Sequence, residues 1–225
     1  MPLRPTFIPP QIPISASSPP PGADWIHEPK LDGYRFQVIK HGGQIQICSR
    51  SGADYSDRLP RMVEWFAHLP THAAVLDGEL CLIDATGAAN FRRLMAEMRT
   101  RKPDEEQLVF MAFDLLHQNG VDLRELPLSE RKRDLRRFCR TSRVPFMREV
   151  ETFPDGLILF THCNCFGFEG VVSKRATSRY VSGPSRFWLK VKCPDWKAEN
   201  DYRHLLLEGP KKPLSERQRE LKKKR

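Results

Sequence analysis

A lysine stands inside a short segment whose residue types could do covalent chemistry. The segment reads Glu-Pro-Lys-Leu-Asp-Gly-Tyr-Arg over residues 28–35. An Asp-Gly turn follows Lys30 and fixes the direction of its side chain, and Arg35 places a permanent positive charge nearby. A lysine amine attacks only when it is unprotonated, and neighbouring cations and desolvation favour that state. The segment therefore indicates a nucleophilic lysine, although a surface turn with a solvated lysine would show the same residues.

Five further segments with charged or aromatic residues follow along the chain. They are Ser49-Arg50, Asp77-Gly78-Glu79-Leu80, Phe113-Asp114-Leu115-Leu116, Glu169-Gly170-Val171-Val172-Ser173-Lys174 and Trp188-Leu189-Lys190-Val191-Lys192. Considered one at a time, Phe113 would be a core aromatic, Glu79 a carboxylate at a strand end and Lys190 a solvated residue at a sheet edge. Their joint order across residues 28–192 favours a single site instead.

The six segments together resemble the ordered motifs of the covalent nucleotidyltransferases. This superfamily contains ATP-dependent DNA ligases, RNA ligases and GTP-using mRNA-capping enzymes. Residues 24–192 are most similar to the ligase domain of bacterial end-joining ligases. The resemblance implies an ATP-grasp-like ligase core in which Lys30 attacks ATP and keeps AMP as a phosphoramidate.

The resemblance also implies which residues hold ATP and a divalent cation. Glu28 would receive the adenine amino group, Arg35 would contact the ribose side, and Phe113 would stack on the adenine. Mg²⁺ or Mn²⁺ would be held by Glu79 and Glu169. The implied ATP-binding set is Glu28, Lys30, Arg35, Arg50, Glu79, Phe113, Glu169, Lys190 and Lys192.

The implied function is that of an ATP-dependent DNA ligase that seals nicks in duplex DNA during repair or recombination. AMP would pass from Lys30 to a 5′-phosphate at the nick, and the neighbouring 3′-hydroxyl would displace it. An RNA ligase and a GTP-using capping enzyme are alternatives, as is a catalytically idle DNA-binding subunit. The forms Trp-Leu-Lys-Val-Lys and Phe-Asp-Leu-Leu favour a DNA ligase, and the intact lysines and glutamates count against an idle subunit.

Hydrophobic periodicity predicts the elements that must position these residues. Strands are predicted at residues 34–40, 44–49, 73–83, 108–116, 170–174 and 187–192. Apolar residues at helical spacing predict helices beginning near Leu59 and Phe91, and two more over 129–140, with Ser129 as N-cap, and 155–165. This order predicts an α+β domain with antiparallel sheets flanked by helices. No GxGxxG or GxxxxGK[ST] supports a dinucleotide fold or a P-loop.

Composition predicts three parts: a proline-rich arm over 1–22, a nucleotidyltransferase domain over 23–196 and a basic tail over 197–225. Eight of the nineteen prolines fall within residues 1–22, which excludes a helix or a central strand and predicts an extended arm. Residues 211–225 carry eight basic and two acidic residues, and the formal net charge of the chain is +9. That balance suits a polyanionic partner, here nicked duplex DNA.

The remaining expectations concern location and partners. No apolar run approaches the ~20 residues of a membrane span, and the N-terminus lacks a signal-peptide pattern. Six scattered cysteines without a CxxC pair favour reduced thiols over zinc, and so a cytoplasmic protein. The resemblance to bacterial DNA ligases implies a location at the nucleoid. Residues 193–225 are too few for the oligonucleotide-binding barrel of complete ligases. We therefore expect a protein partner that supplies such a domain.

Overall fold

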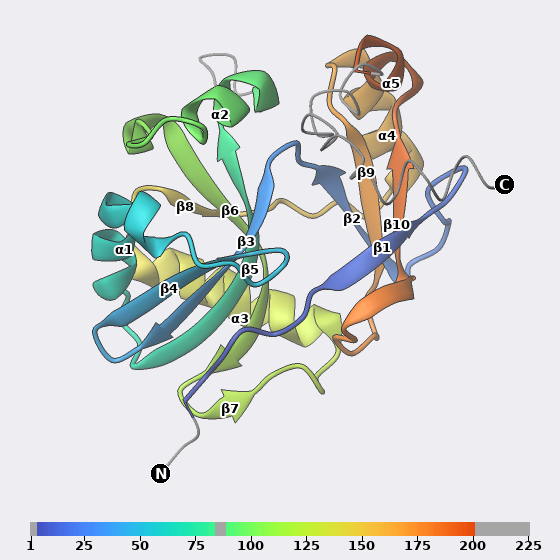
Figure 1. Ribbon diagram of the computed structural model, residues 1–225. Coiled ribbons are helices and arrows are strands. Elements are labelled where there is room, and N and C mark those ends of the chain that lie inside the picture. Colours follow the sequence, from blue (N-terminus) through green and yellow to red (C-terminus); the bar gives the residue numbers. More distant parts are fainter. Residues whose placement is uncertain (1–3, 84–88, 201–225) are drawn as a thin grey trace, which may run out of the picture.

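Two sheets lie side by side in the computed structural model, which describes residues 4–83 and 89–200 (Figure 1). The larger sheet has the order β4-β3-β5-β6-β7, with β8 pairing β6, and the smaller has the order β1-β10-β9-β2. The pairs β1–β10 and β6–β8 are parallel, and the other neighbours are antiparallel. The predicted α+β class with antiparallel sheets and flanking helices is confirmed.

The larger sheet carries one face of the site. Its strands are β3 (Tyr34–His41), β4 (Gln44–Ser49), β5 (Ala73–Leu82), β6 (Leu108–Gln118), β7 (Val121–Asp122) and β8 (Met147–Glu149). Alternate side chains point to opposite faces of a strand, so Phe36 and Val38 enter the main core while Arg35 faces the other way. The predicted hairpin over β3 and β4 is confirmed, with Gly42 in the left-handed region at φ 59°.

Helices cover the core face of the larger sheet. They are α1 (Pro60–Ala67), α2 (Phe91–Glu97) and α3 (Leu128–Ser142), with short 3₁₀ helices η1 (Ser56–Arg58) and η2 (Glu105–Gln107) between them. Buried side chains of the three helices, such as Phe66, Leu94 and Leu135, pack with the sheet in one core. The predicted helices near Leu59 and Phe91 are therefore confirmed.

The start of α3 differs from the prediction that Ser129 caps it. The helix begins at Leu128, its N-cap is Pro127, and no side chain bonds the cap. The main-chain N–H groups of Leu128 and Ser129 instead donate to the carbonyls of Ser178 and Ala176, at 2.9 Å each. The first N–H groups of the helix are thus satisfied by a loop distant in sequence, which local patterning cannot reveal.

The smaller sheet consists of β1 (Gln11–Ser15), β2 (Trp25–Lys30), β9 (Gly170–Arg175) and β10 (Gly183–Lys192). Two helices, α4 (Gly156–Cys165) and α5 (Pro194–Glu199), pack against it through a small core around Val171 and Trp196. Asp155 caps α4 by accepting from the N–H groups of Leu157 and Ile158, so the predicted helix over 155–165 is confirmed.

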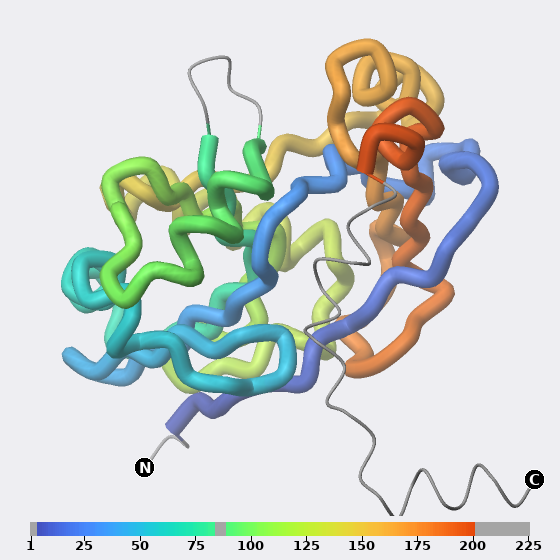
Figure 2. The backbone as a smooth tube through the Cα atoms, turned by 45° about the horizontal axis from the view of Figure 1, so that its top comes forward, coloured from blue at the N-terminus to red at the C-terminus, as the bar shows by residue number. Residues whose placement is uncertain are grey.

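The proline-rich N-terminal segment is extended and joins the two sheets. Ile8 and Gln37 of the larger sheet exchange two hydrogen bonds of 3.0 and 2.6 Å. A few residues later the segment becomes the edge strand β1 on β10 (Figure 2). Pro13 is tolerated there because the main-chain N–H groups on the outer side of an edge strand pair with no other strand. The domain boundaries at residues 22 and 196 stay predictions. Of the predicted basic tail over 197–225, residues 201–225, which include the basic run 211–225, lie outside the described residues.

No helix in the described part of the chain is long and apolar enough to cross a membrane.

Candidate active site

Lys30 is the last residue of β2 and lies beside the first residue of β9. The Lys30 Nζ atom is 2.8 Å from Glu169 Oε2, and the Lys192 Nζ atom is 2.8 Å from Glu169 Oε1. One buried carboxylate thus holds two ammonium groups, which come from β2 and β10, the strands on either side of β9. The strands approach closely at Gly170, where a Cβ would stand 2.0 Å from the Val191 carbonyl oxygen at a φ of 151°. Glycine is required there because any side chain would push β9 away from β10.

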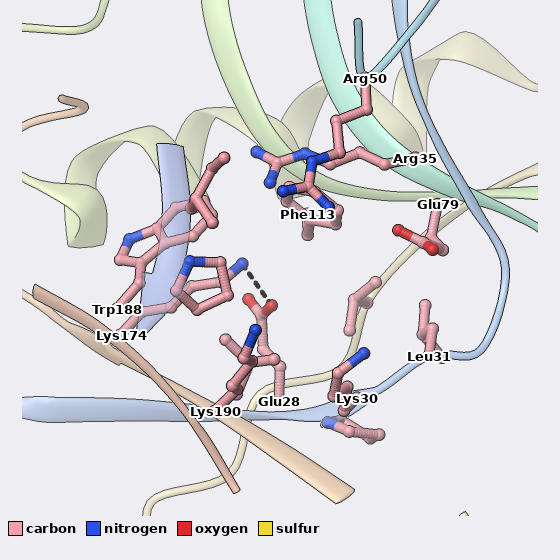
Figure 3. Close-up of a pocket in the computed structure, with 15 residues that line it drawn as sticks. Glu28, Lys30, Leu31, Arg35, Arg50, Glu79, Phe113, Lys174, Trp188 and Lys190 are labelled. Atoms are coloured by element: carbon pink, nitrogen blue, oxygen red, sulfur yellow. Dashed lines mark ion pairs between the residues drawn. The ribbon is translucent and has the colours of Figure 1, made fainter. Parts of the chain in front are cut away.

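A pocket of about 180 Å³ lies between the two sheets, next to Lys30 (Figure 3). It adjoins a wider cleft of about 1030 Å³, and four predicted residues, Lys30, Arg35, Arg50 and Glu79, line both spaces. The other predicted residues divide between the two. The pocket is lined by Glu28, Phe113 and Lys190, and the cleft is lined by Glu169 and Lys192. The structure therefore brings all nine predicted residues together, while their individual roles stay predictions.

The Arg35 guanidinium is held rigidly at the pocket wall. It donates to both Asp77 oxygens, at 3.0 and 2.7 Å, and to the Gln11 carbonyl of β1 at 2.7 Å. The Tyr180 hydroxyl donates to Asp77 Oδ2 at 2.7 Å and accepts from the Gln11 N–H at 3.0 Å. Arg35 also lies over the Phe113 ring, with its central carbon 5.1 Å from the ring centroid. A planar, permanently charged group is thus fixed at one side of the pocket.

Burial and neighbouring charges shift the pKa values of two ionisable side chains near Lys30. Burial raises the pKa of Glu79 to about 7, although the nearby Lys30 and Arg35 oppose that rise. Burial also lowers the pKa of Lys190, and the positive charges of Lys30 and Lys192 lower it further. An added cation would stabilise the charged form of the buried Glu79 carboxylate. An added phosphate would stabilise the charged forms of the clustered lysines.

The carboxylates fit a divalent cation that is bound together with phosphates. Within residues 4–83 and 89–200, no three His, Cys, Asp or Glu side chains converge as a ready-made metal site. Glu79 and Glu169 both line the wide cleft, and Glu169 is one cause of the raised Glu79 pKa. Mg²⁺ usually takes one or two protein carboxylates and fills its other positions with water and substrate phosphate. Glu79 and Glu169 match that arrangement.

Two buried lysines that sequence reasoning did not assign lie beside Glu28: Lys174 lines the pocket, and Lys132 stands outside its lining. Glu28 is 2% exposed, and its oxygens lie 2.7 Å from Lys132 Nζ and 2.5 Å from Lys174 Nζ. Lys174 Nζ is also 4.3 Å from the ring centroids of both Phe113 and Trp188. The Glu28 carboxylate is thus held by two buried ammonium groups beside the Phe113 and Trp188 rings.

Other site residues were also missed by sequence reasoning. Lys174 and Trp188 belong to motifs that were found, but they received no role. Ile12 and Pro13 of the proline-rich segment line the pocket, although the composition of that segment predicted only an extended arm. Asp77 lies in a motif as well. In the pairing of β3 with β5 it is opposite Gln37, and it reaches Arg35 diagonally across the two strands.

Comparison with known proteins places this site in a family. A model described as "ATP dependent DNA ligase domain" matches residues 17–192. The chain is 32% identical over 191 residues to the multifunctional non-homologous end joining protein LigD of Pseudomonas aeruginosa, which covers 84% of this chain and 22% of that protein. It is 34% identical over 196 residues to a probable DNA ligase of Rhodococcus opacus, covering 85% and 38% respectively. The chain therefore spans well under half the length of these relatives.

Solved structures give the same result. A mycobacterial DNA ligase D complexed with ATP and MES matches with a TM-score of 0.72 and 30% identity, over 81% of this chain and 59% of that chain. The ligase domain of LigD from M. tuberculosis matches with a TM-score of 0.71 and 29% identity, over 81% and 60%.

Proposed function

Because the chain belongs to the family of ATP-dependent DNA ligases, we propose that it captures AMP on Lys30 and transfers it to a nick in duplex DNA. One observation carries this proposal: the Lys30 amine lies where the nucleotide pocket meets the wide cleft. A group at that junction can reach a nucleotide in the pocket from one side and a DNA end in the cleft from the other. The nucleotide-bound ligase among the relatives, the mycobacterial DNA ligase D, supports ATP as the substrate.

In the first step the Lys30 nitrogen attacks the α-phosphorus of ATP. The new N–P bond replaces the bond to pyrophosphate, which leaves with its electron pair. Glu169 Oε2, 2.8 Å from Lys30 Nζ, is positioned to take the proton that the amine loses. Lys190, with its lowered pKa, and Lys192 stand next to Lys30 and stabilise the phosphate charge. In the family pattern, the AMP then moves to a 5′-phosphate, and a 3′-hydroxyl expels it to close the nick.

A divalent cation held by Glu79 and Glu169 would neutralise charge on the phosphates. Mg²⁺ or Mn²⁺ suits these two oxygen ligands. Glu28 would accept from the adenine amino group, while Phe113 would offer its face to the ring. Because stacking does not distinguish purines, the preference for ATP over GTP would come from the hydrogen bond between Glu28 and the edge of the base.

We also propose the wider setting from the relatives. Several of them, including the Pseudomonas aeruginosa protein, are named as end-joining proteins, which favours DNA repair as the process. The wide cleft contains Arg50, Lys192 and Lys197 beside Tyr55 and Trp196, a mixture of cations and aromatics suited to a nucleic-acid strand. A bacterial nucleoid location and a partner that supplies an oligonucleotide-binding domain remain part of this proposal.

The test is covalent labelling with ATP carrying ³²P at the α-phosphate. We expect a labelled protein band in the presence of Mg²⁺, and complete loss of the label in Lys30→Ala. Lys102→Ala, a change at an exposed loop lysine, is the matched control and should label like the wild type. Circular dichroism checks that Lys30→Ala remains folded. Peptide mapping should place the AMP on Lys30.

Each other outcome favours a stated alternative. Label that persists in Lys30→Ala assigns the nucleophile elsewhere. Stronger labelling from GTP than from ATP favours a capping-type enzyme, and sealing of nicked RNA but not nicked DNA favours an RNA ligase. An unlabelled wild-type protein that still binds duplex DNA would be an idle DNA-binding subunit.

A further inference from the structure

A buried lysine on α3 lies directly behind the nucleotide pocket. Lys132 is 2% exposed, and its ammonium group has three oxygen neighbours. It is 2.7 Å from Glu28 Oε1, and it donates long hydrogen bonds to the carbonyls of Val150, at 3.4 Å, and Phe113, at 3.5 Å. A buried ammonium persists only where such oxygens replace its water shell.

All three oxygen neighbours belong to residues that line the pocket, although the Lys132 side chain stands outside the lining set of the described chain. Glu28 comes from β2 of the smaller sheet. Phe113 comes from β6 of the larger sheet, and Val150 directly follows β8. One ammonium group therefore links the two sheets at the point where the pocket closes.

These contacts connect the two features that can read a purine. Phe113 offers its ring face, and Glu28 offers an acceptor toward the base edge. The position of Glu28 relative to the Phe113 ring decides whether a base that stacks on Phe113 can also donate a hydrogen bond from its amino group to Glu28. We propose that Lys132 is a positioning residue that fixes Glu28 against Phe113 and so sets the base selectivity of the pocket.

This inference rests on the proposed nucleotide pocket and refines it. Its chemistry is separable from the covalent step, because Lys132 is behind the pocket and Lys30 is at its mouth. Loss of the Lys132 charge should therefore leave the bond-forming groups in place. It should weaken the recognition of a 6-amino purine, which raises KM for ATP more than it lowers kcat.

The deciding comparison uses ATP and ITP, whose base has a carbonyl oxygen where adenine has its amino group. Lys132→Met keeps the length and apolar stem of the side chain but removes its charge. We expect the preference for ATP over ITP to fall by about tenfold, the value of one hydrogen bond to a charged group. Arg133→Met is the matched control on the same helix, because the Arg133 side chain is 70% exposed, and it should keep the wild-type preference.

Two readouts keep this result separate from the proposed function. The rate of covalent labelling gives kcat and KM for both nucleotides, and titration calorimetry gives the two Kd values without any reaction. If the wild type binds ATP but never becomes labelled, the lysyl-AMP proposal fails, and the Kd ratio still tests Lys132. An unchanged ATP-to-ITP ratio in folded Lys132→Met overturns the inference, and so does an equal change in Arg133→Met.

If Lys132→Met does not fold, Lys132→Arg takes its place. A guanidinium keeps the charge but cannot put a single compact cation among the three oxygens. We then expect a folded protein with a reduced ATP preference. A wild-type ratio in that variant would equally overturn the role assigned to Lys132.

Discussion

At the residue scale, His27 is a buried side chain that the folded protein keeps neutral. His27 is 1% exposed, and its Nδ1 atom is 2.8 Å from the Ser173 hydroxyl oxygen. It also packs against Gly156, where an added Cβ would stand 2.5 Å from the imidazole ring. Burial lowers the pKa of His27 from 6.5, and the charge of Asp155 opposes that change in part. The folded protein therefore disfavours the charged imidazole next to Glu28.

This predicts a loss of stability in mild acid. Below pH 6.5 the unfolded chain protonates His27 while the folded chain resists it, so the free energy of unfolding should fall as the pH decreases. The limit for one such group is about 1.4 kcal/mol per pH unit. Urea unfolding at pH 5, 6 and 7 should show a shallower pH dependence in His27→Gln than in the wild type.

His162→Gln, at an exposed position of α4, is the control and should follow the wild type. Parallel curves for the wild type and His27→Gln would contradict the prediction and assign the acid sensitivity to other groups.

At the element scale, α1 is capped by side chains from distant segments. Its own N-cap, Leu59, has no side-chain bond to offer. Glu105 of η2 accepts instead from the N–H groups of Arg61 and Met62, at 3.1 and 2.7 Å. At the other end Lys40 of β3 donates to the Ala67 carbonyl at 2.5 Å. A negative group at the start of a helix and a positive group at its end both suit the helix dipole.

We expect Glu105→Ala to lower the free energy of unfolding by about 1–2 kcal/mol, because two N–H groups at a helix start lose their acceptor. In the described part of the chain, the adjacent Glu106 side chain forms an exposed ion pair with Arg61, so Glu106→Ala should cost clearly less than Glu105→Ala. Urea unfolding with an unchanged m-value measures both. Equal losses in the two variants would mean that the cap contributes nothing beyond surface charge.

The elements with strong periodicity could be predicted from the sequence, and the others depend on distant partners. The hairpin of β3 and β4 and the helix α4 have local signals, so their predictions were confirmed. The edge strand β1 is short and proline-rich, and its pairing with β10 has no local signature. The nine predicted site residues converge because each lies in an ordered motif. Lys132 was missed because it stands in a run of basic residues, and only packing shows which of them is buried.

At the scale of the whole molecule, the proposed DNA substrate could meet positive charge from two parts of the chain. One is the wide cleft with Arg50 and Lys197, and the other is the basic tail over residues 211–225. Deletion of residues 211–225 should weaken binding to any duplex and flatten its salt dependence. The slope of log K against log salt should change by roughly 0.9 for each phosphate contact that is lost.

Fluorescence anisotropy with a nicked duplex at several salt concentrations measures that slope. Covalent labelling by ATP serves as the control, because the pocket is made of residues from the described core and should be unaffected. An unchanged slope would mean that the tail is only a solvated charged segment.

The pairing of β1 with β10 has a consequence for how the chain is made. Gln11 bonds to Tyr180 and Ser185, at sequence separations of 169 and 174 residues. Translation proceeds at roughly 5–20 residues per second, so the first strand waits on the order of ten seconds or more for its partner to leave the ribosome. Ile12 and Pro13 therefore reach their places in the pocket only when nearly all of the described chain exists. The pocket is therefore completed late, and interrupted synthesis yields products in which this wall of the pocket is not in place.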